Sequence, residues 1–215
     1  MRVLELFSGT GSVGKCCSQL GYETYSVDLI SEADFKGDIM DFDYKQFPKD
    51  HFQVVWASPP CTNYSKLQDG WLGRIRKGEL YTKEIQEKEM NNDDKLVLRT
   101  LEIIEYFKPE LWFIENPATS KMKDRIFMKE LPFYIVDYCM YSDWGYRKRT
   151  RVWTNKKDWD AKKCDGKGTC GNMIGTLHKT NLGNNDRIIK TKGKRTTQND
   201  RYRIPEELVF SLLLE

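Results

Sequence analysis

Two short turns carry side chains that could act together on one substrate. Cys61 directly follows Ser58-Pro59-Pro60, and Glu115 opens the sequence Glu115-Asn116-Pro117. A cysteine thiolate is a soft nucleophile that adds to electron-poor carbon, and two prolines fix the backbone that presents it. A protonated carboxyl group can donate to a ring nitrogen while sulfur attacks the ring. The alternatives are a cysteine buried as a small hydrophobic residue and a glutamate that caps a turn or helix.

Each of these turns follows a short apolar segment that we predict to be a strand. Phe52 to Ala57 precedes the Pro-Pro-Cys turn, and Leu111 to Ile114 precedes Glu115. Parallel strands buried on both faces are continuous apolar runs, and their carboxyl ends meet at one edge of the sheet. We therefore expect Cys61 and Glu115 to face the same crevice.

Strand and helix patterns alternate over the first three quarters of the chain. We predict strands over Arg2 to Phe7 and Tyr22 to Leu29, with a helix over Val13 to Leu20 between them, and a second helix over Asp94 to Phe107. This alternation predicts an α/β fold with a doubly wound, mostly parallel sheet of the Rossmann-like kind. The long charged segment Ser65 to Asn92 is predicted to be a lid loop.

A glycine-rich turn follows the first strand and opens the first helix. In Gly9-Thr10-Gly11-Ser12-Val13-Gly14 the backbone can approach a ligand closely, and the helix N-terminus offers amide donors to it. Asp28 ends the next strand, where its carboxylate could accept hydrogen bonds from both hydroxyls of a ribose. Asp38 could bind an adenine amino group while Ile39 packs on the ring. Both NAD and S-adenosylmethionine fit this pattern, as does a simple tight turn without a ligand.

The 215 residues carry a formal net charge of +3, which hides a strong asymmetry. Residues 147–203 contain 17 Lys and Arg against 5 Asp and Glu, a net charge of +12, which leaves −9 for the rest. Such a basic segment is typical of proteins that meet a phosphate backbone, although a basic tail can also simply be solvated. We therefore predict a nucleic acid partner.

Length and composition indicate an ordinary globular protein with one main domain. We expect a catalytic domain over residues 1–155, a small basic irregular lobe over residues 156–200, and a C-terminal helix over residues 201–215 that packs on the catalytic domain. No run of about 18 apolar residues is present, so we predict no membrane span and no secretory signal. The expected location is intracellular and soluble, in cytoplasm or nucleus, with most of the six cysteines as free thiols.

A cysteine and histidine group in the basic lobe admits two interpretations. Cys164, Cys170 and His178 could be three ligands of a structural zinc ion, but their spacing is unusual and no fourth ligand is evident. The alternative is that they are unconnected residues of a basic loop. Cys139 is predicted to be a core or helix residue, and we assign no metal ligand.

Taken together, the motifs resemble those of the DNA cytosine-5 methyltransferase family, which also has a tRNA-methylating branch. The resemblance covers about residues 1–155 and consists of these segments in order: Leu4 to Gly11, Asp28, Asp38-Ile39, Pro59-Pro60-Cys61, Glu115-Asn116-Pro117 and Arg147 to Arg151.

The resemblance implies roles for individual residues. Cys61 is the implied nucleophile that adds to C6 of a flipped cytosine, and Glu115 its acid partner. Arg149 and Arg151 match the two arginines of the family's Gln-x-Arg-x-Arg motif, and Arg151 would hold the base oxygen. The implied cofactor is S-adenosyl-L-methionine. The residues implied to line its pocket are Phe7, Gly9, Gly11, Asp28, Leu29, Asp38, Ile39 and Pro60.

The chain also departs from the family pattern. Arg147 stands where the family has Gln, the usual Gly-Asn motif near the end is missing, and the recognition region is much shorter than usual. We therefore expect a short recognition sequence or a protein partner that completes target recognition. DNA is the expected substrate. RNA, a catalytically silent nucleic-acid-binding module, an NAD-dependent oxidoreductase and an amino-methylating enzyme are the alternatives.

Overall fold

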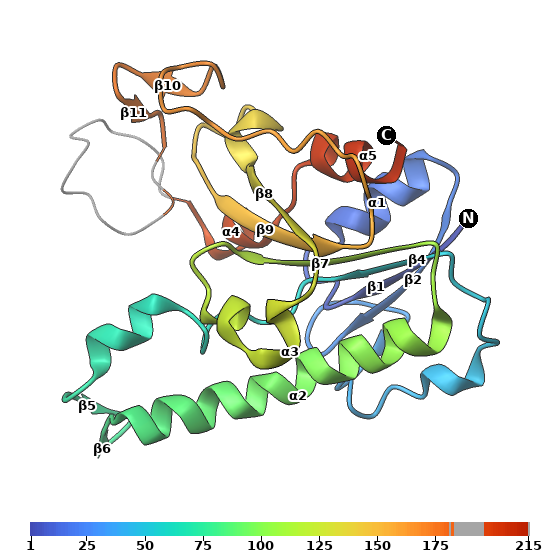
Figure 1. The fold of residues 1–215 in the computed structure, drawn as a ribbon, viewed down its shortest axis with the longest axis horizontal. Helices are drawn as coiled ribbons and strands as arrows, with labels where there is room; N and C mark the ends of the chain where they lie inside the picture. The colour runs from blue at the N-terminus through green and yellow to red at the C-terminus, as the bar shows by residue number, and fades with distance from the viewer. Residues whose placement is uncertain (181, 183–195, 215) are drawn as a thin grey trace.

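The computed structural model describes residues 1–180, 182 and 196–214 and contains one large sheet (Figure 1). Two further sheets are hairpins of two-residue strands, β5 (Ile75–Arg76) with β6 (Glu79–Leu80) and β10 (Met173–Ile174) with β11 (Leu177–His178). The large sheet has seven strands, in the spatial order β3 (Phe35–Lys36), β2 (Glu23–Asp28), β1 (Arg2–Leu6), β4 (Val54–Ala57), β7 (Leu111–Pro117), β9 (Arg149–Thr154) and β8 (Phe133–Asp137).

Five neighbouring strands of this sheet are parallel, and the chain reverses only at one edge. β3, β2, β1, β4 and β7 pair in parallel, whereas β9 pairs antiparallel with both β7 and β8. The sheet grows in two directions from β1. β2 and β3 are added on one side of it, and β4 and the later strands on the other. The predicted doubly wound, mostly parallel α/β fold is confirmed.

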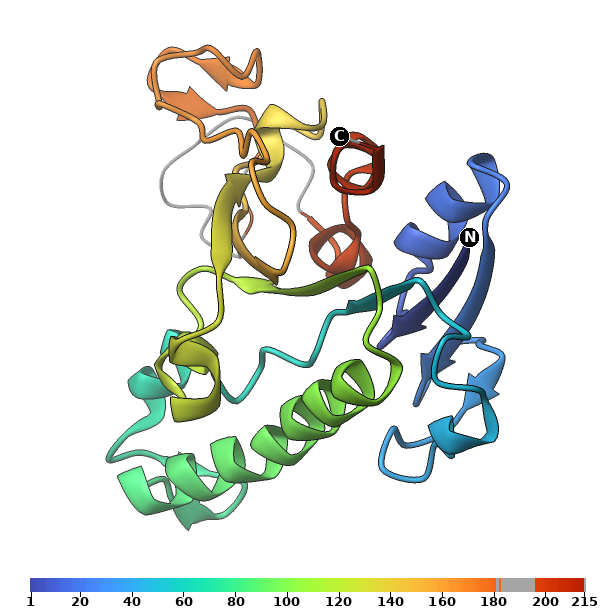
Figure 2. The same ribbon diagram turned by 45° about the vertical axis from the view of Figure 1, so that its right-hand side comes forward.

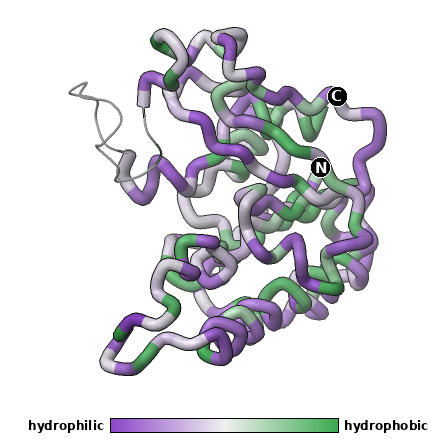
Figure 3. Tube along the Cα trace, turned by 60° about the vertical axis from the view of Figure 1, so that its left-hand side comes forward, coloured by the Kyte–Doolittle hydropathy of each residue, from purple (hydrophilic) through white to green (hydrophobic). Residues whose placement is uncertain are grey.

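Helices cover both faces of the sheet. Helices α2 (Lys83–Phe107) and α3 (Ile126–Lys129) lie on one face, while α1 (Ser12–Gln19) and α5 (Glu206–Leu214) lie on the other (Figures 1 and 2). Because side chains alternate along a strand, β1 sends Leu4 and Leu6 to the α2 side and Val3 to the α1 side. Figure 3 shows many hydrophobic segments in the middle of the molecule and a mixture of hydrophilic and hydrophobic stretches around its rim.

The segment predicted to be a lid loop, Ser65 to Asn92, is partly helical, so the prediction of a loop is wrong for residues 83–92. After the short helix η2 (Lys66–Trp71) and a hairpin of β5 (Ile75–Arg76) and β6 (Glu79–Leu80), α2 begins at Lys83, where the Thr82 hydroxyl accepts the amide of Ile85. Three inward-facing positions of this helix are polar, Gln86, Asp94 and Thr100. Polar residues on a buried face hide the helical periodicity that sequence patterns rely on.

Glu5 is an acidic residue inside the sheet, beneath the start of α1. It is 3% exposed, and its carboxylate accepts the amides of Val13 and Gly14. Burial raises its pKa to about 7, although these two hydrogen bonds act in the opposite direction. The carboxyl group therefore ties the glycine turn to β1.

We expect Glu5 to make the protein less stable as the pH rises from about 4.5 to about 7. Its folded-state pKa lies above the unfolded-state value, so the folded chain binds the proton more tightly. The free energy of unfolding therefore falls by at most about 3 kcal/mol over this interval. Urea unfolding of Glu5→Gln across this range should show a flatter pH dependence than the unchanged protein. Glu23→Gln, which alters an exposed carboxylate, is the control. An equal slope in Glu5→Gln and the unchanged protein would contradict the expectation.

The C-terminal part of the chain adds small elements around the antiparallel edge. Residues 156–180 form an irregular segment with the hairpin of β10 (Met173–Ile174) and β11 (Leu177–His178). The short helix α4 (Gln198–Tyr202) leads into α5, which packs against α1. Residues 181 and 183–195 of the predicted lobe lie outside the described residues, and the division into three units stays a prediction. Within the described chain, none of the helices is long and apolar enough to span a bilayer.

Candidate active site

The turn that carries Cys61 is fastened to the strand that carries Glu115. β4 and β7 are parallel neighbours, with Ala57 opposite Ile114, so both segments leave the sheet at the same edge. The side-chain amide of Asn116 donates to the carbonyl oxygen of Pro59 at 2.9 Å in a buried position. This bond fixes the Pro-Pro-Cys turn against the Glu-Asn-Pro segment.

Helix α2 holds the same turn from its other side. The Tyr64 hydroxyl donates to Asp94 at 2.7 Å, and the Asn63 amide donates to Asp93 at 3.1 Å. Tyr64 is fully buried, whereas Cys61, between the anchored residues Pro59 and Asn63, is only partly buried. The thiol therefore lies on a rigid turn and still has access to solvent.

Cys61 and Glu115 lie close enough for their charges to interact. Burial raises the pKa of the Cys61 thiol, the negative charge of Glu115 raises it further, and the positive charge of Lys148 lowers it. The resting state therefore favours the protonated thiol, and the thiolate gains stability when the Glu115 charge is neutralised. Such coupling suits a thiol that becomes nucleophilic only when a proton reaches Glu115.

Two residues hold the Glu115 carboxylate, which is 6% exposed. The Tyr138 hydroxyl donates to Oε1 at 2.8 Å, and the Lys148 ammonium lies 3.2 Å from the same oxygen. Lys148 is itself buried and lies over the Tyr138 ring, 4.6 Å from its centre. The ammonium group thus contacts Glu115 directly and acts electrostatically on Cys61.

The structure does not bring Arg149 and Arg151 to this group. In the antiparallel pairing of β7 with β9, Glu115 is opposite Val152 and Asn116 is opposite Arg151. Directly opposed residues share a face of the sheet and successive residues alternate, so the two arginines point away from the Glu115 side. Lys148 directly precedes β9 and continues this alternation, so it lies on the Glu115 side.

Each arginine has a different partner on its own face. Arg149 forms an ion pair with the buried carboxylate of Asp137, at 2.7 Å. The Arg151 guanidinium lies 3.8 Å from the centre of the Phe133 ring, and burial lowers its pKa. Lys148 and Tyr138 were not singled out from the sequence. The basic run Arg147 to Arg151 was the signal for Lys148, but the sequence did not say which of its members faces Glu115.

The glycine turn has the backbone that its sequence predicts. Gly9 and Gly11 adopt positive φ angles of 50° and 64°, and Phe7 shares this left-handed region at 58°. Asp28 contributes to the turn itself, because its Oδ2 accepts the amide of Gly9 at 2.9 Å while Oδ1 accepts the amides of Ile30 and Ser31. Although burial alone would raise it, these hydrogen bonds hold the pKa of Asp28 below its usual value, so the carboxylate stays charged.

The other residues predicted to bind a cofactor occupy different environments around this edge. Leu29 is exposed at 63%, and Pro60 is exposed as well. Ile39 is 4% exposed and packs within the core on the α2 side, while the Asp38 carboxylate accepts the amide of Met40. Leu29 and Pro60 are thus accessible to a ligand in this structure, and Ile39 is mostly covered by the protein.

Comparison with known proteins gives one decisive relationship. No protein-family model matches the chain. A curated protein of Frog virus 3 (isolate Goorha), named "Probable DNA (cytosine-5)-methyltransferase", is 41% identical over 220 residues, which cover 99% of each chain. The chain belongs to the DNA (cytosine-5)-methyltransferase family. The predicted family resemblance is therefore confirmed.

A solved structure supports the fold of this family member. It is an E. coli prophage-encoded protein proposed to be a DNA modification methyltransferase, and it matches with a TM-score of 0.50 and 12% identity. The match covers 72% of this chain and 46% of that one, so this chain corresponds to less than half of that protein's length. At this identity the likeness concerns the fold alone.

The glycine edge of this methyltransferase fits S-adenosylmethionine, the cofactor that the family generally uses. The Ser8 hydroxyl is buried without a hydrogen-bond partner among the described residues, directly before Gly9. Leu29 and Ile30 leave apolar surface exposed at the end of β2, beside the charged Asp28. An unpaired hydroxyl, apolar surface and a fixed carboxylate match the polar and aromatic parts of a nucleoside.

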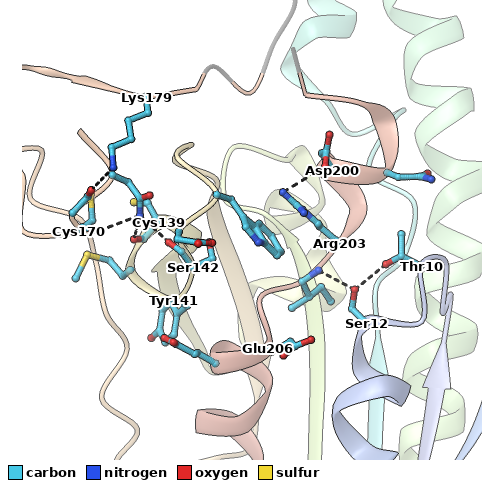
Figure 4. Close-up of a pocket in the computed structure, with 18 of the residues that line it drawn as sticks. Thr10, Ser12, Cys139, Tyr141, Ser142, Cys170, Lys179, Asp200, Arg203 and Glu206 are labelled. Carbon is cyan, nitrogen blue, oxygen red and sulfur yellow. Dashed lines mark hydrogen bonds and ion pairs between the residues drawn. The ribbon is translucent and has the colours of Figure 1, made fainter. Parts of the chain in front are cut away.

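An open cavity of about 1030 Å³ lies on another side of the glycine turn (Figure 4). Ser12 accepts the amide of Ile204 at one wall, and Arg203 lies 3.7 Å from the centre of the Trp144 ring at another. Its lining mixes basic and acidic side chains and does not include Cys61 or Glu115. The cavity therefore lies among the glycine turn, the segment after β8 and the C-terminal helices, and it is distinct from the thiol site.

Proposed function

We propose that this protein transfers a methyl group to C5 of cytosine in DNA through a covalent bond between Cys61 and C6 of the base. The observation that carries the proposal is the electrostatically coupled group of Cys61, Glu115 and Lys148 on one rigid sheet edge. The charge of +12 over residues 147–203 favours a nucleic acid as the substrate, and the name of the Frog virus 3 relative favours DNA.

The target base must leave the double helix to meet this thiol. Cys61 lies on a turn at the sheet edge, and a base stacked within a duplex cannot bring C6 to a partly buried sulfur. We therefore expect base flipping. The basic residues of segment 147–203 would hold the phosphate backbone during this step, and the protein would either read a short recognition sequence or rely on a protein partner to complete target recognition.

Glu115 would neutralise the pyrimidine ring as sulfur attacks. Tyr138 and Lys148 both contact Oε1, and we assign Oε2 to N3 and the exocyclic amine of cytosine. Donation of a proton to N3 lets the ring accept the electron pair from the Cys61 thiolate. While Glu115 holds this proton it carries no charge that raises the pKa of Cys61, so the protonated acid favours the thiolate, and the carboxylate charge returns only as N3 receives the proton.

The carbon that becomes electron-rich is C5, which then forms the new bond. S-adenosylmethionine, when bound at the glycine edge, supplies an electrophilic methyl group. After methylation a base removes the C5 proton, and the electron pair of that C–H bond re-forms the C5–C6 double bond as the Cys61 thiolate leaves. The residues we assign to the cofactor are Phe7, Gly9, Gly11, Asp28, Leu29, Asp38, Ile39 and Pro60.

Trapping with 5-fluorocytosine tests the proposal. Fluorine at C5 cannot leave as a proton does, so the covalent complex should accumulate when the protein meets S-adenosylmethionine and duplex DNA that contains this base. The duplex should be a mixture of random sequences, so that every short recognition sequence is present. Denaturing electrophoresis and mass spectrometry then detect a species that contains protein, DNA and one methyl group.

A parallel reaction with a fluorinated RNA separates the alternatives. An adduct on DNA alone supports the proposal, and an adduct on RNA alone places the same chemistry on RNA. No adduct on either nucleic acid, from a protein that still binds S-adenosylmethionine in calorimetry, would identify a silent binding module. The family's C-terminal Gly-Asn motif, which the chain lacks, bears on cofactor affinity. The calorimetric measurement therefore also tests how strongly this chain binds S-adenosylmethionine.

A further inference from the structure

Four possible metal ligands converge where the irregular segment of residues 156–180 meets the sheet. Cys139 belongs to the short helix η4 (Tyr138–Met140) that follows β8, whereas Cys164, Cys170 and His178 belong to the irregular segment. One ligand atom from each of the four lies within 4.8 Å of every other. The sequence suggested three of these residues, and the fold supplies Cys139 as the fourth.

The distances within the cluster match tetrahedral zinc coordination. The Nε2 atom of His178 lies 3.7 Å from the sulfur of Cys164 and 3.6 Å from the sulfur of Cys170. With Zn–S bonds of about 2.3 Å and Zn–N bonds of about 2.0 Å, a tetrahedral site separates sulfur from nitrogen by about 3.5 Å. All four side chains can therefore reach one central ion with little movement. The three cysteines are free thiols.

The chemistry of the ligands also favours zinc. Three thiolates and one imidazole form a closed set of soft and borderline ligands, which is typical of structural zinc sites and leaves no position for a substrate. The backbone amide of Gly166 points at the sulfur of Cys164, at 3.4 Å. An amide donor to sulfur stabilises the negative charge that a bound thiolate carries.

Residues 156–180 need such a link because they have almost no core. Their buried side chains are Trp159, Cys164 and Asn172, and β10 and β11 have two residues each. A segment this small seldom folds on hydrophobic burial alone and commonly depends on a metal or a disulfide. Residues 156–180 also carry part of the net charge of +12 that lies over residues 147–203.

Hydrogen bonds position the ligand-bearing backbone around the cluster. The Asn172 side-chain amide donates to the carbonyl oxygens of Cys139 and Cys170, at 2.9 and 3.0 Å. The buried carboxylate of Asp137 accepts the amide of Cys164 at 2.9 Å. The backbones of Cys164 and Cys170 are thereby held next to that of Cys139 in η4.

We propose that Cys139, Cys164, Cys170 and His178 bind one structural Zn²⁺ ion that fastens residues 156–180 to the catalytic sheet. The ion takes no part in methyl transfer, because it has four protein ligands. Its role is to hold the basic segment in one orientation beside the site of Cys61 and Glu115. The proposal does not depend on the proposed reaction.

Elemental analysis of the purified full-length protein tests this site. We expect about one zinc ion per chain, and near-complete loss in Cys170→Ser and in His178→Ala. Cys61→Ala removes a thiol outside the cluster and should keep the zinc. Absence of bound zinc from protein purified and then incubated with zinc, or full zinc content in both ligand variants, would overturn the proposal.

A second measurement separates metal binding from general misfolding. The unchanged protein, stripped by a chelator and titrated with Co²⁺, should develop the visible absorption of a tetrahedral thiolate site, saturating at one equivalent. Limited proteolysis should cut residues 156–180 faster in the stripped protein, and added Zn²⁺ should restore resistance. Absorption typical of octahedral Co²⁺, or proteolysis that is indifferent to zinc, would contradict the assignment.

Discussion

Replacement of Cys61 by alanine abolishes the covalent complex with 5-fluorocytosine DNA and lowers methyl transfer by about 10³-fold or more. The reason is that no other group in the site can form the bond to C6 that makes C5 nucleophilic. The side chain is partly exposed on a turn held by Asn116 and Tyr64, so its truncation leaves these anchors in place. Radioactive methyl transfer and the gel-shifted adduct measure the effect.

Cys16→Ala provides the matched control for this variant. Cys16 is a fully buried free thiol of α1 in the core on the other side of the sheet. Its loss should leave the adduct in place, whereas unchanged thermal unfolding of Cys61→Ala shows that the fold survives. Methyl transfer by Cys61→Ala at the rate of the unchanged protein would refute the nucleophile assignment.

Replacement of Glu115 by glutamine lowers methyl transfer by about 10²- to 10⁴-fold. An amide cannot give a proton to N3, so the ring accepts the sulfur electrons poorly. The same change makes Cys61 more reactive toward iodoacetamide, because the Glu115 charge that raises the pKa of the thiol is gone. Peptide mass spectrometry after timed alkylation at pH 8 measures Cys61 separately from the other cysteines.

Lys148→Met is the informative partner of this variant. The Lys148 charge lowers the pKa of Cys61, so its removal should slow alkylation of Cys61, opposite to Glu115→Gln, while methyl transfer falls in both. A purely structural role for the two residues predicts changes of alkylation in the same direction. Equal shifts in both variants would therefore argue against the electrostatic coupling of the site.

Some features of this protein follow from short stretches of sequence. The strands over β1, β2, β4 and β7, the glycine turn and α1 were predictable, because each depends on local propensity and on apolar runs of a few residues. The meeting of the Cys61 and Glu115 turns at one edge follows from the parallel order of buried strands. The beginning of α2 was not predictable in this way, since buried polar residues such as Asp94 are held by partners distant in sequence.

Only the tertiary structure decided which basic residue stands beside Glu115 and which cysteine completes the metal cluster. A one-residue shift of register between β7 and β9 would exchange Lys148 for its neighbours, and nothing local in the basic run fixes that register. Cys139 and Cys170 are 31 positions apart in the sequence, and they converge because β8 and the irregular segment fold against each other. The sequence by itself determined the types of reactive groups and the sheet edge that carries them. Their exact partners depend on long-range pairing, which a local pattern cannot encode.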